Sequence, residues 1–273
     1  MKEPQKILIN GITLNLYVEG EGEPLMFLHG FPDSQKEWRY LIPHFLKAGF
    51  KVIAYDQRGF GESDAPEEQK AYEIDKIVAD ALAVLKYLKI GEKVNLVGHD
   101  WGAFIGWQLC LEHPEFFKRY VAISVGHPLA YRHAGFEQKL KGWYILAYQL
   151  PAYPEWLLSH KNWAILHKIA GKNPETANWI RDLSRPGRLS SAINWYRANF
   201  FYLAGKNFKK CTVPTLGIYS KGDIALTEKQ MTDSRKYMFA EWRYECIEDS
   251  SHWIPLDQPD ALAKTILGWL NGP

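Results

Sequence analysis

The sequence predicts an α/β protein in which a mostly parallel β-sheet is covered by helices on both faces. Short apolar runs of strand length alternate with longer stretches that have the periodicity of amphipathic helices, and this alternation is typical of parallel sheets. The chain has 273 residues, of which 47% are hydrophobic and 23% charged. It is therefore long enough for one domain of ~250 residues with an insertion.

The predicted strands begin with a hairpin and continue as buried runs. Residues 7–10 and 13–18 flank Asn10-Gly11, a dipeptide that favours a tight turn between antiparallel strands. The later runs lack polar alternation, which is typical of strands buried on both faces. They are residues 24–28, 51–55, 93–97, 117–125 and 212–219, with a further apolar-rich run at 241–247. The helical stretches are residues 36–48, 74–88, 101–112, 227–236 and 259–270.

The alternation of strands and helices is interrupted once. From near Gly126 to about Gly205 the sequence is helical and rich in aromatic residues, and after Cys211 the alternation resumes. Five tryptophans lie in this interruption: Trp143, Trp156, Trp163, Trp179 and Trp195. We therefore expect a core domain formed by residues 1–126 and 206–273, with a helical insertion of residues 127–205.

Charge and composition exclude several classes of protein. Lys and Arg number 33 against 31 Asp and Glu, with no basic run, so we expect no nucleic-acid partner. Cys110, Cys211 and Cys246 are isolated, and we expect no disulfide framework, no metal and no other cofactor. The chain shows no apolar leader and no uncharged run of the ~20 residues that a membrane span needs. We expect a cytoplasmic protein without a membrane span, and the oligomeric state stays open.

The most informative stretch is a predicted strand-to-helix turn around Asp100. Gly98 and Gly102 flank it in a G-x-D-x-G pattern, which matches the G-x-S-x-G nucleophile elbow with Asp in place of Ser. A carboxylate is ionised at neutral pH and attacks without a base. Attack on an ester would give a high-energy anhydride, whereas attack on saturated carbon gives a stable alkyl ester. Asp100 thus predicts displacement at carbon, the alternative being an ordinary helix N-cap.

Partners for such a nucleophile follow in the expected order. Asp223 comes directly after the apolar run 212–219, and His252 comes after the run 241–247. Both positions are strand-end loops, where open parallel sheets gather their ligands, and the order nucleophile, acid, His is that of elbow enzymes. The alternatives are a turn residue and a surface histidine. We expect the backbone N–H groups of Phe31 and Trp101 to form an oxyanion hole.

Together these segments resemble the epoxide hydrolases of the α/β-hydrolase fold, relatives of the haloalkane and fluoroacetate dehalogenases. The matching motifs are H-G-F-P at 29–32, D-x-R-G-x-G-x-S at 56–63, G-H-D-W-G-A at 98–103, K-G-D at 221–223 and S-H-W at 251–253. The resemblance covers nearly the whole chain. It implies the α/β-hydrolase fold, a mostly parallel sheet flanked by helices, with residues 127–205 as an inserted helical cap.

The resemblance also implies roles for cap tyrosines. Family members use two of them as acids, one before a Q-x-P element and one in an N-W-Y-R segment. Here Tyr144 lies five residues before Gln149-Leu150-Pro151, and Tyr196 lies in the segment 194–197, while Tyr148 is an alternative to Tyr144. A phenol with a pKa of ~10 stays protonated at neutral pH and can donate to an epoxide oxygen.

The family mechanism then follows for this chain. Asp100 attacks an epoxide carbon to form an ester, and His252, oriented by Asp223, activates water that releases a vicinal diol. The implied partners are a small apolar epoxide and water. We expect Trp143, Tyr148 and Trp253 to line the substrate pocket.

Two other functions remain open. A dehalogenase would use the same Asp–His–Asp groups, but Phe31 offers no side-chain donor where haloalkane dehalogenases commonly have Asn. Gly142 and Trp101 depart from the fluoroacetate dehalogenase pattern, although Trp101 and Trp143 could still donate to a halide. A non-catalytic ligand-binding protein on the same fold would have lost at least one catalytic position, and none is missing here.

Overall fold

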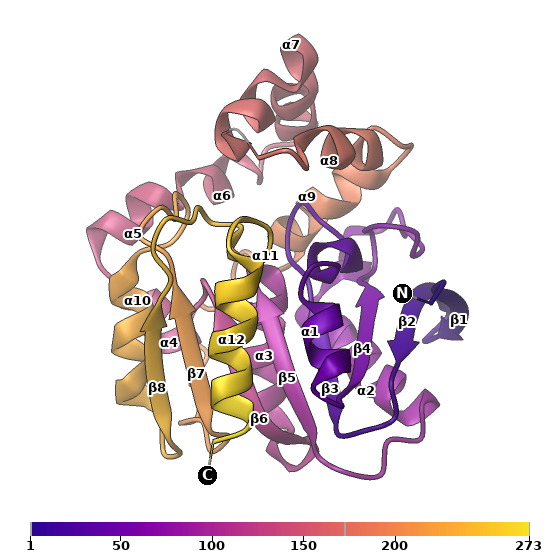
Figure 1. Ribbon diagram of the computed structural model, residues 1–273. Coiled ribbons are helices and arrows are strands. Elements are labelled where there is room, and N and C mark those ends of the chain that lie inside the picture. The colour runs from indigo at the N-terminus through magenta and orange to yellow at the C-terminus, as the bar shows by residue number, and fades with distance from the viewer. Residues whose placement is uncertain (1, 172, 273) are drawn as a thin grey trace.

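The computed structural model describes residues 2–171 and 173–272 and is organised around an eight-stranded sheet (Figure 1). The spatial order of the strands is β1-β2-β4-β3-β5-β6-β7-β8. The first two strands form the predicted hairpin, β2 also pairs antiparallel with β4, and the remaining neighbours are parallel. The strands are β1 (Gln5–Ile9), β2 (Ile12–Glu19), β3 (Pro24–Leu28), β4 (Lys51–Asp56), β5 (Val94–His99), β6 (Phe117–Ile123), β7 (Thr215–Tyr219) and β8 (Trp242–Cys246).

Helices cover both faces of the sheet, as the sequence predicts. Along β3, Leu25 and Phe27 pack into one apolar cluster while Met26 and Leu28 pack into another, because successive side chains of a strand point to opposite faces. α1 (Ile42–Lys47) and α12 (Pro259–Leu270) belong to the first cluster, and α2 (Ile74–Tyr87) and α3 (Trp101–Glu112) belong to the second. The prediction of a mostly parallel α/β sheet is therefore confirmed.

Several short elements connect the core. They are the 3-10 helices η1 (Gln35–Trp38), η2 (Gln69–Tyr72), η3 (Pro114–Phe116) and η4 (Asp233–Tyr237), with the short helices α10 (Glu228–Thr232) and α11 (Ile254–Asp257). The helix expected over 36–48 is wrong as one element, because it divides into η1 and α1. Pro43 lies in the first turn of α1, where its missing N–H is tolerated. Inside a longer helix, Pro43 would remove a backbone hydrogen bond and break the helix.

The strands flanking the insertion are shorter than expected. β6 ends at Ile123 rather than at residue 125, and β7 begins at Thr215 rather than at residue 212. Pro214 has no N–H to donate to a sheet ladder, and its carbonyl oxygen accepts from the Tyr120 amide at the start of the pairing.

Among the described residues, six helices lie between β6 and β7. They are α4 (Pro128–Arg132), α5 (Phe136–Lys141), α6 (Trp143–Ala147), α7 (Tyr153–Ala170), α8 (Thr176–Leu183) and α9 (Arg188–Ala198). Figure 1 shows α6 to α9 gathered beyond the upper ends of the strands, with α7 and α8 farthest from the sheet. α4 packs instead against α10 and η4 of the core.

The inserted helices are attached to the core by buried indoles. The Trp179 Nε1 on α8 donates to Asp33 Oδ2 at 2.8 Å, and the Trp195 Nε1 on α9 donates to the Arg58 carbonyl oxygen at 3.1 Å. The Trp179 ring also packs against Trp253, with 4.8 Å between centroids. These contacts hold α8 and α9 over the carboxyl ends of the parallel strands, where the predicted site residues lie.

Candidate active site

Asp100 lies in a strained turn between β5 and α3. Its backbone has φ +50° and ψ −119°, a conformation that non-glycine residues rarely adopt. A Cβ on Gly98 would lie 2.4 Å from the Gly102 carbonyl oxygen, and one on Gly102 would lie 1.9 Å from that of Leu28. The G-x-D-x-G spacing is therefore a steric requirement, because only glycine lets the helix approach the strands closely enough for this turn.

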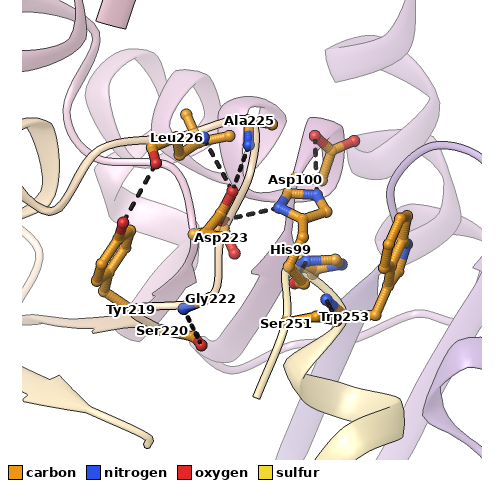
Figure 2. A network of polar contacts seen from close by, with 12 residues as sticks. His99, Asp100, Tyr219, Ser220, Gly222, Asp223, Ala225, Leu226, Ser251 and Trp253 are labelled. Carbon is orange, nitrogen blue, oxygen red and sulfur yellow. Dashed lines mark hydrogen bonds and ion pairs between the residues drawn. The ribbon is translucent and has the colours of Figure 1, made fainter. Parts of the chain in front are cut away.

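The structure brings Asp100, Asp223 and His252 together. His252 Nδ1 donates to Asp223 Oδ2 at 2.8 Å, and the other ring nitrogen, Nε2, lies 3.6 Å from Asp100 Oδ2. Asp223 follows β7, and its Oδ1 accepts the backbone N–H groups of Ala225 and Leu226 at 2.8 and 2.9 Å (Figure 2). Because these amides fix the carboxylate, they also fix the direction in which the His252 ring points.

The three groups shift one another's pKa in a consistent way. Burial lowers the pKa of His252, but the carboxylates of Asp223 and Asp100 raise it, and the result lies well above its ordinary value. Burial raises the pKa of both carboxyls, whereas His252 lowers it, and for each the net direction is downward. The resting site thus holds an imidazolium between two carboxylates.

Two backbone amides point at the Asp100 carboxylate. The Phe31 N–H, in the turn after β3, donates to Asp100 Oδ1 at 2.8 Å. A hydrogen bond from the Trp101 backbone also helps to lower the pKa of Asp100, after the larger opposing effect of burial and the effect of His252. These are the two amides predicted for the oxyanion hole, and the structure places both beside the Asp100 carboxylate.

Three tyrosines of the insertion form an aromatic group opposite Asp100. Tyr144 lies on α6, Tyr148 directly after it and Tyr196 on α9, with ring centroids 5.0 to 5.9 Å apart. The Tyr196 ring also contacts Trp101 at 5.0 Å. Burial raises the pKa of all three phenols, and the Asp100 charge raises each further. All three are therefore protonated at neutral pH and can donate a proton.

Two cavities meet at Asp100. One measures about 120 Å³ and the other about 160 Å³, and Asp100, Tyr144 and Tyr196 line both. The rest of the first cavity is lined mainly by apolar side chains, including Phe104, Val125 and Leu203, with Asn199 as a polar exception. Trp143, Tyr148 and Trp253, the three residues predicted for the substrate pocket, all line the second. A ligand at Asp100 would thus have apolar space on both sides and phenols above it.

Two residues of this region were not predicted from the sequence. Tyr131 on α4 lines the first cavity, and burial raises its pKa to about 12. Lys141, at the end of α5, donates from Nζ to the carbonyl oxygens of Asp223 and Leu226 at 2.6 and 2.8 Å, so it braces the loop that presents the Asp223 carboxylate. Tyr131 follows closely on a strand end, which could have indicated it, whereas no sequence signal marks Lys141.

Within residues 2–171 and 173–272, no group of three His, Cys, Asp or Glu side chains is placed to hold a metal ion. Over the same residues, no helix combines the length and apolar character needed to cross a membrane.

Comparisons with known proteins define the family. The sequence profile of the alpha/beta hydrolase fold matches residues 23–259. Human epoxide hydrolase 4 is 32% identical, over 97% of this chain and 78% of that protein. The AB hydrolase superfamily protein YfhM of Bacillus subtilis is also 32% identical, over 98% and 97%. A solved epoxide hydrolase structure from metagenomes of hot environments matches with a TM-score of 0.87 and 29% identity, covering 100% of both chains.

The chain is therefore an α/β hydrolase. Within that family it belongs with the epoxide hydrolases, as its sequence motifs predicted.

Proposed function

We propose that this protein hydrolyses epoxides to vicinal diols through a covalent ester on Asp100. The observation that carries the proposal is a carboxylate at the elbow facing two phenols, Tyr144 and Tyr196, across the same cavities. Displacement at carbon needs the first group, and opening of an epoxide needs the second. Relatives of about 32% identity that are named epoxide hydrolases support this reaction.

The first step forms the ester. The Asp100 carboxylate attacks one epoxide carbon, the bond from that carbon to the ring oxygen breaks, and its electron pair stays on the oxygen. A phenol, Tyr144 or Tyr196, gives that oxygen a proton. We assign the first acid to Tyr144 rather than Tyr148 because Tyr144, like Tyr196, lines both cavities, whereas Tyr148 lines one. The lowered pKa of Asp100 keeps the nucleophile ionised.

Ester formation prepares His252 for the second step. The Asp100 charge is one of the causes that raise the pKa of His252, and esterification removes that charge. The imidazolium then gives up a proton, which returns the tyrosinate to a phenol through solvent, and the neutral imidazole becomes a base. The charge of Asp223 remains and keeps the ring oriented.

The second step releases the diol. His252 takes a proton from water as the hydroxide attacks the carbonyl carbon of the ester, and the oxyanion that forms accepts from the Phe31 and Trp101 amides. When this intermediate collapses, the leaving diol oxygen takes the proton of the newly added hydroxyl group, and Asp100 returns to a carboxylate beside a protonated His252. The net reaction adds one water to one epoxide.

The insertion serves as a cap in this proposal. Residues 127–205 supply both acids and about half of the apolar wall residues, while the core, residues 1–126 and 206–273, supplies the nucleophile, the base, the oxyanion amides and the other half. The mostly apolar walls of both cavities favour a small apolar epoxide with a substituent on either side of the reacting carbons.

An isotope experiment tests the covalent route. With enzyme in excess over styrene oxide in H₂¹⁸O, the label of the first turnover should enter the Asp100 carboxylate and be absent from the diol. Mass spectrometry of the peptide containing Asp100 and of the diol reads both outcomes. Label in the first diol would mean that water attacks the epoxide directly. Release of halide from haloalkanes, measured in parallel, distinguishes a dehalogenase.

A further inference from the structure

A second histidine–carboxylate pair lies behind the first. Glu37, on η1, and His99, the last residue of β5, are both fully buried, and His99 Nδ1 forms an ion pair with Glu37 Oε1. The other nitrogen of this ring, Nε2, lies 2.8 Å from the backbone carbonyl oxygen of His252. The rings of His99 and His252 contact each other, with 4.8 Å between centroids, and His99 lies next to Asp100 (Figure 2).

The partners of His99 fix where its protons are. A carbonyl oxygen can only accept, so Nε2 must carry a hydrogen to bond to His252. Nδ1 lies within ion-pair distance of the Glu37 carboxyl group. The Glu37 carboxyl group is the group that faces Nδ1, so it influences which ring nitrogen of His99 carries a hydrogen and hence the bond to the main chain of His252.

Glu37 also reaches the oxyanion turn. Its Oε2 lies 3.4 Å from the Gly30 backbone N–H, one residue before the Phe31 amide that points at Asp100. One buried carboxylate therefore contacts the segment that presents the oxyanion amide and, through His99, the segment that presents the base. Apolar side chains of the same volume commonly stabilise a fold as well as a buried ion pair does. Stability alone does not account for charges at this place.

We propose that Glu37 and His99 are positioning residues that hold the main chain of His252 for ester hydrolysis. This proposal rests on the proposed function. The Nε2–H of His99 fixes the His252 carbonyl and hence the distance from its imidazole to the Asp100 ester and its water. Ester formation uses the Asp100 carboxylate and the cap phenols, which Glu37 does not contact. Loss of the pair should therefore slow hydrolysis of the ester much more than its formation.

Two substitutions of Glu37 separate a hydrogen-bonding role from simple packing. In Glu37→Gln, the amide N–H can donate to Nδ1, so a neutral His99 keeps its hydrogen on Nε2 and its bond to His252. Glu37→Leu retains similar volume but leaves Nδ1 without a partner and the ring free to change tautomer. Formation and decay of the ester with styrene oxide are followed in single turnovers by intact-protein mass after acid quenching.

We expect ester decay to slow roughly 10- to 100-fold in Glu37→Leu, because small displacements of a catalytic group have effects of that size. Ester formation should change less than about threefold, and Glu37→Gln should stay near the wild type in both steps. Equal slowing of both steps, unchanged decay in folded Glu37→Leu, or the same loss in Glu37→Gln would each overturn the proposal. If the wild type forms no ester from any epoxide, the proposed function fails instead.

A matched control and a second pair of variants complete the experiment. Arg58 and Asp80 form another buried ion pair, with N–O distances of 2.6 and 2.7 Å and no contact with His252. Asp80→Asn should lower thermal stability and leave the ratio of the two rates unchanged. If Glu37→Leu does not fold, the comparison moves to His99. His99→Gln keeps a donor for the His252 carbonyl and should retain faster ester decay than His99→Met, and equal rates would overturn the proposal.

Discussion

The core and the cap contribute to the site in different physical ways. In the core, polar groups are fixed by hydrogen bonds at strand ends: two amides hold Asp223, Asp223 holds His252, and the Phe31 amide holds Asp100. In the cap, Tyr144, Tyr148 and Tyr196 are placed by aromatic packing, with ring centroids 5.0 to 5.9 Å apart. The difference suggests that core substitutions stop one chemical step, whereas cap substitutions weaken an acid function that two residues share.

The largest expected effect comes from removing the base in the core. His252→Gln should consume about one equivalent of epoxide and then stall as an ester on Asp100, because the ionised nucleophile needs no base but the hydrolytic water does. Intact-protein mass should show the adduct persisting for the whole assay. A folded variant that forms no adduct would show that His252 is needed before the ester forms, and the division of labour within the core would be wrong.

A smaller and graded effect is expected from the cap. Tyr144→Phe and Tyr196→Phe should each slow ester formation without abolishing it, since one phenol remains. In the double variant the rate of ester formation should fall roughly 10²–10⁴-fold, which is the usual contribution of general acid catalysis. The rate at which a preformed ester decays should change little. Pre-steady-state Trp fluorescence measures the rate, with Trp101 as reporter beside Asp100.

Tyr148→Phe is the matched control for the cap. It removes a buried phenol of the same aromatic group that lines one cavity. Ring volume is kept in all three variants, so losses of packing should be small. If Tyr148→Phe lowers the rate of ester formation more than Tyr144→Phe does, Tyr148 rather than Tyr144 is the first of the two acids. A double variant that forms ester at the wild-type rate would return both tyrosines to a packing role.

The smallest expected effect is on stability, and it depends on pH. The pKa of His252 is raised in the folded protein, so its contribution is fully present below its unfolded value of about 6.5 and is lost as pH rises through the folded value. The difference in Tm between wild type and His252→Gln should therefore shrink as pH rises from 6 to 10. Calorimetry or fluorescence melting measures it, and a difference that grows with pH would contradict the charge arrangement of the site.

His127 gives a control of opposite sign. Burial lowers its pKa to about 4, so its contribution is fully present above pH ~6.5 and is lost as pH falls through the folded value. The Tm difference between wild type and His127→Gln should grow between pH 4 and 7. The same slope for both histidines would show that pH acts on the fold in some other way.

The part of the site that lies in the core could be predicted from the sequence, because short-range sequence patterns indicate each of its residues. The turn at Asp100 needs glycine at 98 and 102 for steric reasons, so the elbow is visible as a spacing. Asp223 and His252 follow apolar runs, and the carboxyl ends of parallel strands meet at one edge of a sheet. Where local rules conflict, the prediction fails: a single helix over 36–48 fits the apolar periodicity, but Pro43 divides it.

The sequence by itself determined the fold class. It also predicted that Asp100, Asp223 and His252 lie at strand-end loops in this order, because backbone strain acts over a few residues and sheet topology follows chain order. The tertiary structure alone decided which tyrosines face Asp100, where the two cavities meet, and that Glu37 reaches His99 across 62 positions of chain. Aromatic packing and buried ion pairs join distant segments and leave no periodic trace in either segment, so only the folded arrangement reveals them.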